Sequence, residues 1–160
     1  MHAQHRKLAW LFIAGAVFVI VGLLLLPMLN MYSRDLPQQV HPAFEWQIVS
    51  TLFYGAWATE AILIIIAVVP LVFSFIVLVL SISILRGKSS SKTVPLIWRL
   101  SLIGLIVQFV FSLLVHMLVE MGVRNDLAIG FFMVLLGFLV IILATLVTRV
   151  KANTQSPFSK

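Results

Sequence analysis

Three ionisable side chains have types and positions that could do chemistry. His116 and Glu120 are four residues apart, so a helix would carry them on one face. Glu60 opens a separate apolar run, at a similar expected depth in a membrane. An imidazole beside carboxylates could relay protons near neutral pH, bind a divalent metal or contact a basic group of a partner. The simpler alternative is that all three side chains reach headgroups and water and have no specific role.

A stripe of polar and small residues precedes His116 and Glu120 in the apolar segment that contains them. Its members recur every three or four residues and so lie along one side of a helix: Ser101, Gly104, Gln108, Ser112, His116 and Glu120. Because unsatisfied polar groups cost free energy in hydrocarbon, we expect the stripe to face other helices. We expect Gln108 and the serines to bond to those helices. Glu60, His116, Glu120 and Gln108 form the candidate polar cluster.

Other motifs for chemistry are few. Arg124 could hold a headgroup phosphate beside the cluster, as a lipid-modifying enzyme would need. The chain has no cysteine, which excludes thiolate nucleophiles, Cys-ligated zinc and iron-sulfur clusters. It also has no glycine-rich phosphate loop and no GxSxG sequence. Since His-x-x-x-Glu is far less specific than HExxH, we expect no metal site and no cofactor.

The elements that must position these residues are four long apolar segments. Hydrophobic residues make up 62% of the 160 residues and charged residues 10%, far outside the range of soluble proteins. A helix of about 20 apolar residues crosses the hydrocarbon of a bilayer. We therefore predict an all-α integral membrane protein, a four-transmembrane-helix bundle that forms a single membrane domain over residues 1–160. The predicted spans cover residues 8–29, 61–85, 96–118 and 127–148.

The segments between the spans are predicted to be irregular. Residues 30–45 form the longest polar loop, in which Pro37 and Pro42 prevent a helix. Residues 46–60 mix aromatic and polar side chains, as headgroup-level segments do, so residues 30–60 make an outer loop and an interfacial segment. The remaining segments are a short basic cytoplasmic loop over 86–95, a tight polar turn over 119–126 and a disordered cytoplasmic tail over 149–160.

Two of the spans carry pairs of glycines seven residues apart. Gly15 and Gly22 lie in the first span, and Gly130 and Gly137 lie in the fourth. Residues seven apart share a helix face, and a face without side chains lets another helix approach closely. We therefore predict helix packing at both pairs.

The basic residues predict the orientation. Four spans put both termini on one side, where nine of the eleven Lys and Arg residues fall. The other side has all five acids and only Arg34 and Arg124. Because basic loops remain in the cytoplasm, we predict a plasma-membrane protein with cytoplasmic N- and C-termini. The basic side could also attract anionic lipid headgroups, although topology alone explains it.

These observations favour an interaction protein over an enzyme. Three spans are nearly free of polar groups and no catalytic set is recognisable, so we expect a non-enzymatic accessory subunit of a membrane assembly. Its partners would be the lipid bilayer and another membrane protein or a second copy, and not nucleic acid, because no basic stripe has interleaved aromatics. The alternative is a small proton-coupled carrier that uses the candidate polar cluster. A lipid-headgroup-modifying enzyme is the weaker alternative.

Overall fold

Four long helices and three short strands make up the described part of the chain. A computed structural model describes residues 2–32, 40–44, 57–88, 90, 92–120 and 125–154. The helices are α1 (His2–Leu25), α3 (Trp57–Leu85), α4 (Thr93–Glu120) and α5 (Ile129–Thr154). The strands are β1 (Pro27–Tyr32), β2 (Val40–Phe44) and β3 (Asn125–Leu127).

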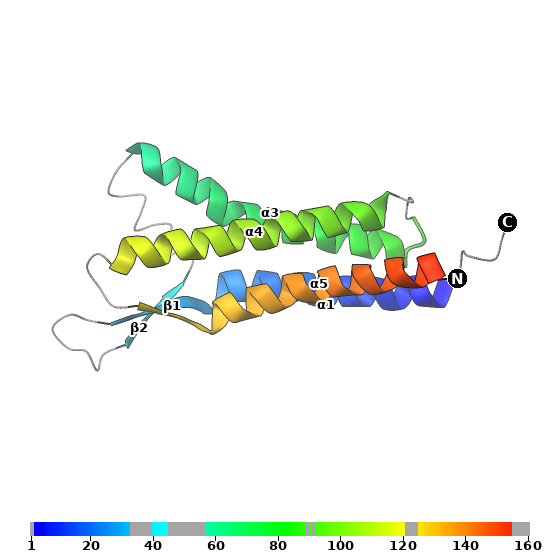
Figure 1. Ribbon diagram of the computed structural model, residues 1–160, viewed down its shortest axis with the longest axis horizontal. Helices are drawn as coiled ribbons and strands as arrows, with labels where there is room; N and C mark the ends of the chain where they lie inside the picture. The colour runs from blue at the N-terminus through cyan, green and yellow to red at the C-terminus, as the bar shows by residue number, and fades with distance from the viewer. Residues whose placement is uncertain are drawn as a thin grey trace.

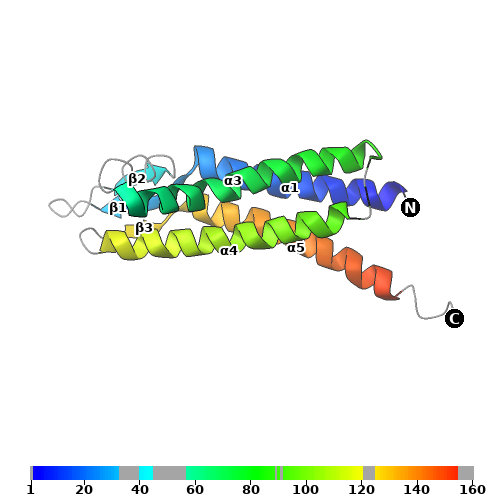
Figure 2. The ribbon, with the colours of Figure 1, turned by 90° about the horizontal axis from the view of Figure 1, so that it is seen from above.

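The four helices run side by side along the long axis of the molecule (Figure 1). α1 packs against α3 and α5, and α4 packs against the same two helices. Figure 2 shows the start of α1 and the end of α5 at one end of the molecule, with the strands at the other. We call these the terminal end and the sheet end.

All four helices are long and apolar enough to cross a membrane. The stretches that qualify are Arg6–Leu25, Val68–Leu85, Thr93–Leu113 and Ile129–Thr148. Each stretch overlaps one of the four predicted spans, so the prediction of four helices of spanning length is confirmed.

Most helix ends differ from the predicted spans. α1 begins at His2 and not at residue 8, α3 begins at Trp57 and not at residue 61, and α4 begins at Thr93 and not at residue 96, so the predicted irregular segments over 46–60 and 86–95 are wrong for residues 57–60 and 93–95.

Two other ends differ for a clear physical reason. α1 ends at Leu25 instead of residue 29, because Pro27 cannot donate the backbone hydrogen bond that another turn needs. α5 continues to Thr154, so the prediction of a disordered tail is wrong for residues 149–154. This stretch contains Arg149, Lys151 and Ala152, whose residue types favour a helix, and so the helix continues.

A three-stranded antiparallel sheet in the order β2-β1-β3 forms the sheet end. The predicted loop over 30–45 is therefore wrong for the residues in β1 and β2, and the predicted turn over 119–126 contains the first residues of β3. Asn30 of the central strand pairs with Pro42 on one side and with Asp126 on the other. The edge position of β2 tolerates Pro42, which has no N–H to donate. The fold is helical with a small sheet added.

Gly87 ends α3 and turns the chain toward α4. Its φ of 73° lies in the left-handed region, which glycine adopts without strain. The Gly87 N–H donates to the Ile84 carbonyl and the Lys88 N–H to the Ser83 carbonyl, both at 3.0 Å. These two bonds form a Schellman cap. Pro95 follows in the first turn of α4, where a backbone N–H would have no helical partner.

Two apolar clusters form the core. One joins all four helices: Leu8, Ala9, Phe12, Ala16, Val77, Ile84, Ile97, Ile141 and Ala144. The other joins α1, β1 and α5: Val19, Leu23, Met28, Phe131, Val134 and Phe138. Because Met28 of β1 is 3% exposed, the sheet is docked onto the α1 and α5 pair.

Candidate functional site

The three predicted ionisable residues lie on helices at the sheet end. Glu60 is in the first turn of α3, and His116 and Glu120 are near the end of α4. In Figure 1 the first turns of α3 diverge from the end of α4. The side chains of all three, and Arg124 as a whole, lie outside the described residues. Their convergence, and the headgroup contact of Arg124, stay predictions.

The polar stripe of α4 is buried among the helices. Ser101 and Gln108 are fully buried and Ser112 is 7% exposed. The Gln108 Nε2 donates to the Ser112 Oγ at 3.4 Å, so the bond shown runs within α4 and not to a neighbouring helix as predicted. The Gln108 Oε1 and the Ser101 Oγ have no hydrogen-bond partner among the described residues. A buried polar group without a partner costs about 1–3 kcal/mol, so Gln108 lowers the stability of the folded protein.

Three further hydroxyl groups of the described residues are fully buried between helices, and each bonds within its own helix. Ser74 and Ser81 of α3 donate to the carbonyls four residues earlier, at 2.7 and 2.6 Å. Thr145 of α5 donates to the Ile141 carbonyl at 2.9 Å. A hydroxyl reaches this carbonyl without help from a neighbouring helix. These residues therefore need no polar partner on another helix.

The predicted packing glycines face each other where α1 meets α5. A Cβ atom on Gly137 would lie 2.6 Å from the Gly15 carbonyl oxygen, and one on Gly15 would lie 2.7 Å from the Gly137 carbonyl oxygen. For Gly22 and Gly130 the two corresponding distances are both 2.9 Å. Neither pair leaves room for a side chain, so the two backbones approach as closely as at small-residue helix interfaces. The spacing of the glycines indicated a close approach, but it did not indicate that the two pairs meet each other.

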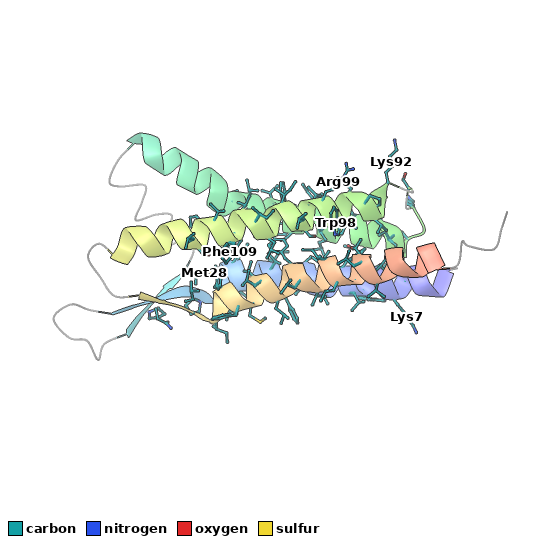
Figure 3. The ribbon with its side chains drawn as sticks, in the orientation of Figure 1. Lys7, Met28, Lys92, Trp98, Arg99 and Phe109 are labelled. Atoms are coloured by element: carbon teal, nitrogen blue, oxygen red, sulfur yellow. The ribbon has the colours of Figure 1, made fainter. Side chains whose placement is uncertain are left out.

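The described basic side chains gather at the terminal end. All are exposed, and they come from α1, from the connection between α3 and α4, and from α4: Arg6, Lys7, Arg86, Lys88, Lys92 and Arg99. Figure 3 shows Lys7, Lys92 and Arg99 toward this end, with Met28 toward the other. The acidic residues Glu60, Glu120 and Asp126 belong to segments at the sheet end. Charge is therefore separated along the helix axes.

Large apolar side chains cover the outer faces of the helices. Val79 of α3 is 61% exposed, Ile106 of α4 is 54% exposed and Leu143 of α5 is 58% exposed. These faces enclose the buried amide and hydroxyl groups described above. Between its two ends the described part of the molecule thus has an apolar surface, and its apolar core contains several buried polar side chains.

Neither metal ligands nor similarity identifies an activity. Within the described ranges, no three His, Asp or Glu residues could hold a metal ion together. Comparisons with protein families, with characterised proteins and with solved structures find no match.

Proposed function

We propose that the chain is a multi-pass protein of the plasma membrane whose four helices form a transmembrane bundle. The arrangement of polarity supports this proposal, because the outer faces carry Val, Leu, Ile and Phe while Gln108 and several hydroxyls are inside. Soluble proteins prefer the reverse, whereas lipid favours apolar outer faces and polar groups that face the interior. The exposed Lys and Arg residues at the terminal end favour cytoplasmic termini.

Within that membrane we propose a non-enzymatic role as an accessory subunit that binds another membrane protein through α3. The uneven burial of the spans carries this proposal. In the 18-residue apolar window of each helix, 44% of the residues are buried in α1 and in α5, 33% in α4 and 28% in Val68–Leu85 of α3, which is the lowest value among the described windows. The exposed side chains of α3 recur every one to four residues along one side: Val68, Val72, Phe75, Ile76, Val79 and Ile82.

The contrast with α1 and α5 explains why α3 is the helix offered to a partner. The glycine pairs already join α1 to α5 along backbones that touch. α3 lacks such a contact among its described residues and keeps a broad apolar face uncovered. Association of helices in lipid depends on close packing of such faces. The α1 and α5 pair would be the scaffold and α3 the binding element.

Photocrosslinking in intact cells tests this role. A photoreactive amino acid at Val79, which is 61% exposed, is expected to give one discrete adduct with a second membrane protein. The same amino acid at Val77, on the same helix but fully buried, is the matched control and should give none. Adducts with lipid alone at position 79 would contradict the accessory role. A partner-free monomer that is active in vesicles would contradict it as well.

Gln108 favours one second candidate, a small proton-coupled carrier. Its buried Oε1 has no partner among the described residues, so it could accept a hydrogen bond from a transported molecule or a water. Glu60, His116 and Glu120 would carry the protons. This candidate predicts pH-dependent flux in vesicles that Glu60→Gln and Glu120→Gln abolish. Flux that is unchanged in both variants would remove it.

A further inference from the structure

A shallow groove runs between α4 and α5 on the outer surface. Its volume is about 390 Å³, and its lining is apolar throughout: Leu105, Ile106, Phe109 and Val110 of α4 with Leu135 and Leu139 of α5. Ile106 and Phe109 are 54% and 55% exposed, so the groove opens sideways. In a membrane that opening would face lipid.

The packing of α4 on α5 fixes the position of the groove. A Cβ atom on Gly104 would lie 2.7 Å from the Phe138 Cζ, so the ring occupies the space that a side chain at position 104 would need. Phe138 is fully buried, and its neighbour Leu139 is 44% exposed on the outer side. The inner contact is therefore tight, while the outer side of the same helix pair stays open.

A basic side chain continues the same face of α4 toward the terminal end. Arg99 precedes Ile106 by seven residues, a spacing that keeps both on one side of the helix, and Lys92 lies directly before the first residue of α4. Lys92 and Arg99 are both exposed and lie near this end in Figure 3. At 1.5 Å per residue, Ile106 lies about 10 Å below Arg99 along the axis. One leaflet of hydrocarbon is about 15 Å deep, so cation and groove fit within one leaflet.

We propose that Arg99, Lys92 and the groove form a binding site for an anionic phospholipid. The phosphate lies at Arg99 and Lys92, and one acyl chain lies in the groove. A guanidinium suits this role because it donates two N–H bonds to phosphate oxygens. An acyl chain fills the groove without leaving a polar group unpaired. The site rests on the membrane insertion proposed above, but it is independent of the accessory role of α3.

The dimensions of the groove favour a lipid chain over a partner helix. A helix is about 10 Å wide with its side chains and needs a broader face than one shallow groove. The cations at one end of the groove add a preference for a negative headgroup.

Native mass spectrometry of the full chain tests the headgroup contact. The purified protein is offered equal amounts of phosphatidylglycerol and phosphatidylcholine with identical acyl chains, and the ratio of retained lipids is measured. We expect a preference for phosphatidylglycerol that Arg99→Gln lowers about fivefold, the effect of one basic residue near anionic lipid. Arg99→Lys should restore most of it. Lys7→Gln, which removes a cation from the same end but from the opposite side in Figure 3, should leave it unchanged.

Filling the groove tests the acyl-chain contact. Leu139→Trp should lower retention of both lipids, whereas Leu136→Trp should not, because Leu136 is similarly exposed on α5 but does not line the groove. Glycerol phosphate, which has no chains, should fail to displace the lipid. The proposal would be overturned if Lys7→Gln and Arg99→Gln lowered the preference for phosphatidylglycerol equally, or if the two Trp variants lowered lipid retention equally. Displacement of the lipid by glycerol phosphate, or retention of a protein subunit in place of lipid, would overturn it as well. Size-exclusion profiles identify any misfolded variant. If Arg99→Gln misfolds, the lipid preference of Arg99→Lys still tests the headgroup contact.

Discussion

Gly137 has no room for a side chain at the α1 and α5 interface. A Cβ atom there would lie 2.6 Å from the Gly15 carbonyl oxygen and 2.9 Å from the Val19 nitrogen. Both are backbone atoms that cannot rotate away, so the helices would have to separate. Gly137→Val is therefore expected to lower the free energy of unfolding by about 1–3 kcal/mol, the usual cost of overpacking. Thermal unfolding in detergent measures the loss.

Ala14 provides the control for that prediction. It precedes Gly15 on α1 but is exposed, so a larger side chain there meets no neighbouring helix. Ala14→Val is expected to change the free energy of unfolding by no more than about 0.5 kcal/mol. Equal losses in Ala14→Val and Gly137→Val would mean that the glycine pairs do not set the spacing of the two helices.

A substitution at Gln108 is expected to raise the free energy of unfolding, in contrast to Gly137→Val. Gln108→Met replaces a buried amide, whose Oε1 has no partner among the described residues, by an apolar side chain of similar size. The free energy of unfolding should rise by about 1 kcal/mol, because the cost of the unpaired oxygen disappears. Ser112 can then bond to a carbonyl of its own helix.

The matched control for Gln108→Met is Thr145→Val. The Thr145 hydroxyl is also fully buried, but it donates to the Ile141 carbonyl at 2.9 Å, so its removal should bring no gain. Both variants are measured by thermal unfolding in the same detergent. A loss of stability in Gln108→Met would show that the Oε1 has a partner, such as a bound water.

The sequence predicted the burial of Gln108 and Ser101 but not their hydrogen bonds. Polar residues spaced by three or four positions reveal the inward face of a helix, because any polar stripe in hydrocarbon must turn inward. Hydrogen bonds depend on where the side chains of neighbouring helices lie, and the spacing of residues in the sequence does not give those positions. The glycine pairs illustrate the same limit: a helix contact could be predicted from Gly15 and Gly137, but not the meeting of one with the other.

At the scale of elements, the sheet is the feature that the sequence did not predict. Its strands are three to six residues long and two contain proline, which hides the alternation that reveals a strand. Each proline lies where a strand tolerates it. Pro27 is the first residue of β1, and Pro42 lies in the edge strand β2. Pairing with distant residues, and not local pattern, makes these segments strands.

Engineered cysteines test the register of that pairing. The chain has no cysteine of its own, so a new pair gives an unambiguous disulfide. Asn30 pairs with Asp126 in the β1 and β3 ladder, which places their Cβ atoms about 5 Å apart. Asn30→Cys with Asp126→Cys is expected to form a disulfide under mild oxidation, detected by peptide mass spectrometry.

The control for the register is Asn30→Cys with Asn125→Cys. Asn125 pairs with Met31, so its side chain points to the opposite face of the sheet from that of Asn30. This pair should form little disulfide. Equal yields from the two pairs would contradict the register and would indicate that the β1 and β3 segments do not form a fixed ladder.

For the whole molecule, the number of helices of spanning length could be predicted from the sequence, but their arrangement could not. Apolar runs of about 20 residues have one stable form in lipid, the helix, so length and composition suffice to find them. Which helix lies beside which depends on side-chain fit. The pairing of α1 with α5, the least-covered position of α3 and the groove between α4 and α5 all follow from that fit.

The separation of charge gives the molecule a direction. Among the described residues, the exposed Lys and Arg side chains lie at the terminal end, and Glu60, Glu120 and Asp126 belong to segments at the sheet end. We propose that this asymmetry places the basic end in the cytoplasm. The accessory role, the carrier candidate and the lipid site all depend on this insertion.

Labelling of single cysteines in intact cells tests the insertion most directly. Ser90 is exposed in the connection between α3 and α4, and Pro42 is exposed in β2 at the other end of the molecule. Pro42→Cys should react with a membrane-impermeant maleimide in intact cells, whereas Ser90→Cys should react only after the cells are opened. Reaction of Ser90→Cys in intact cells, or protection of Pro42→Cys in them, would contradict a four-span protein with cytoplasmic termini.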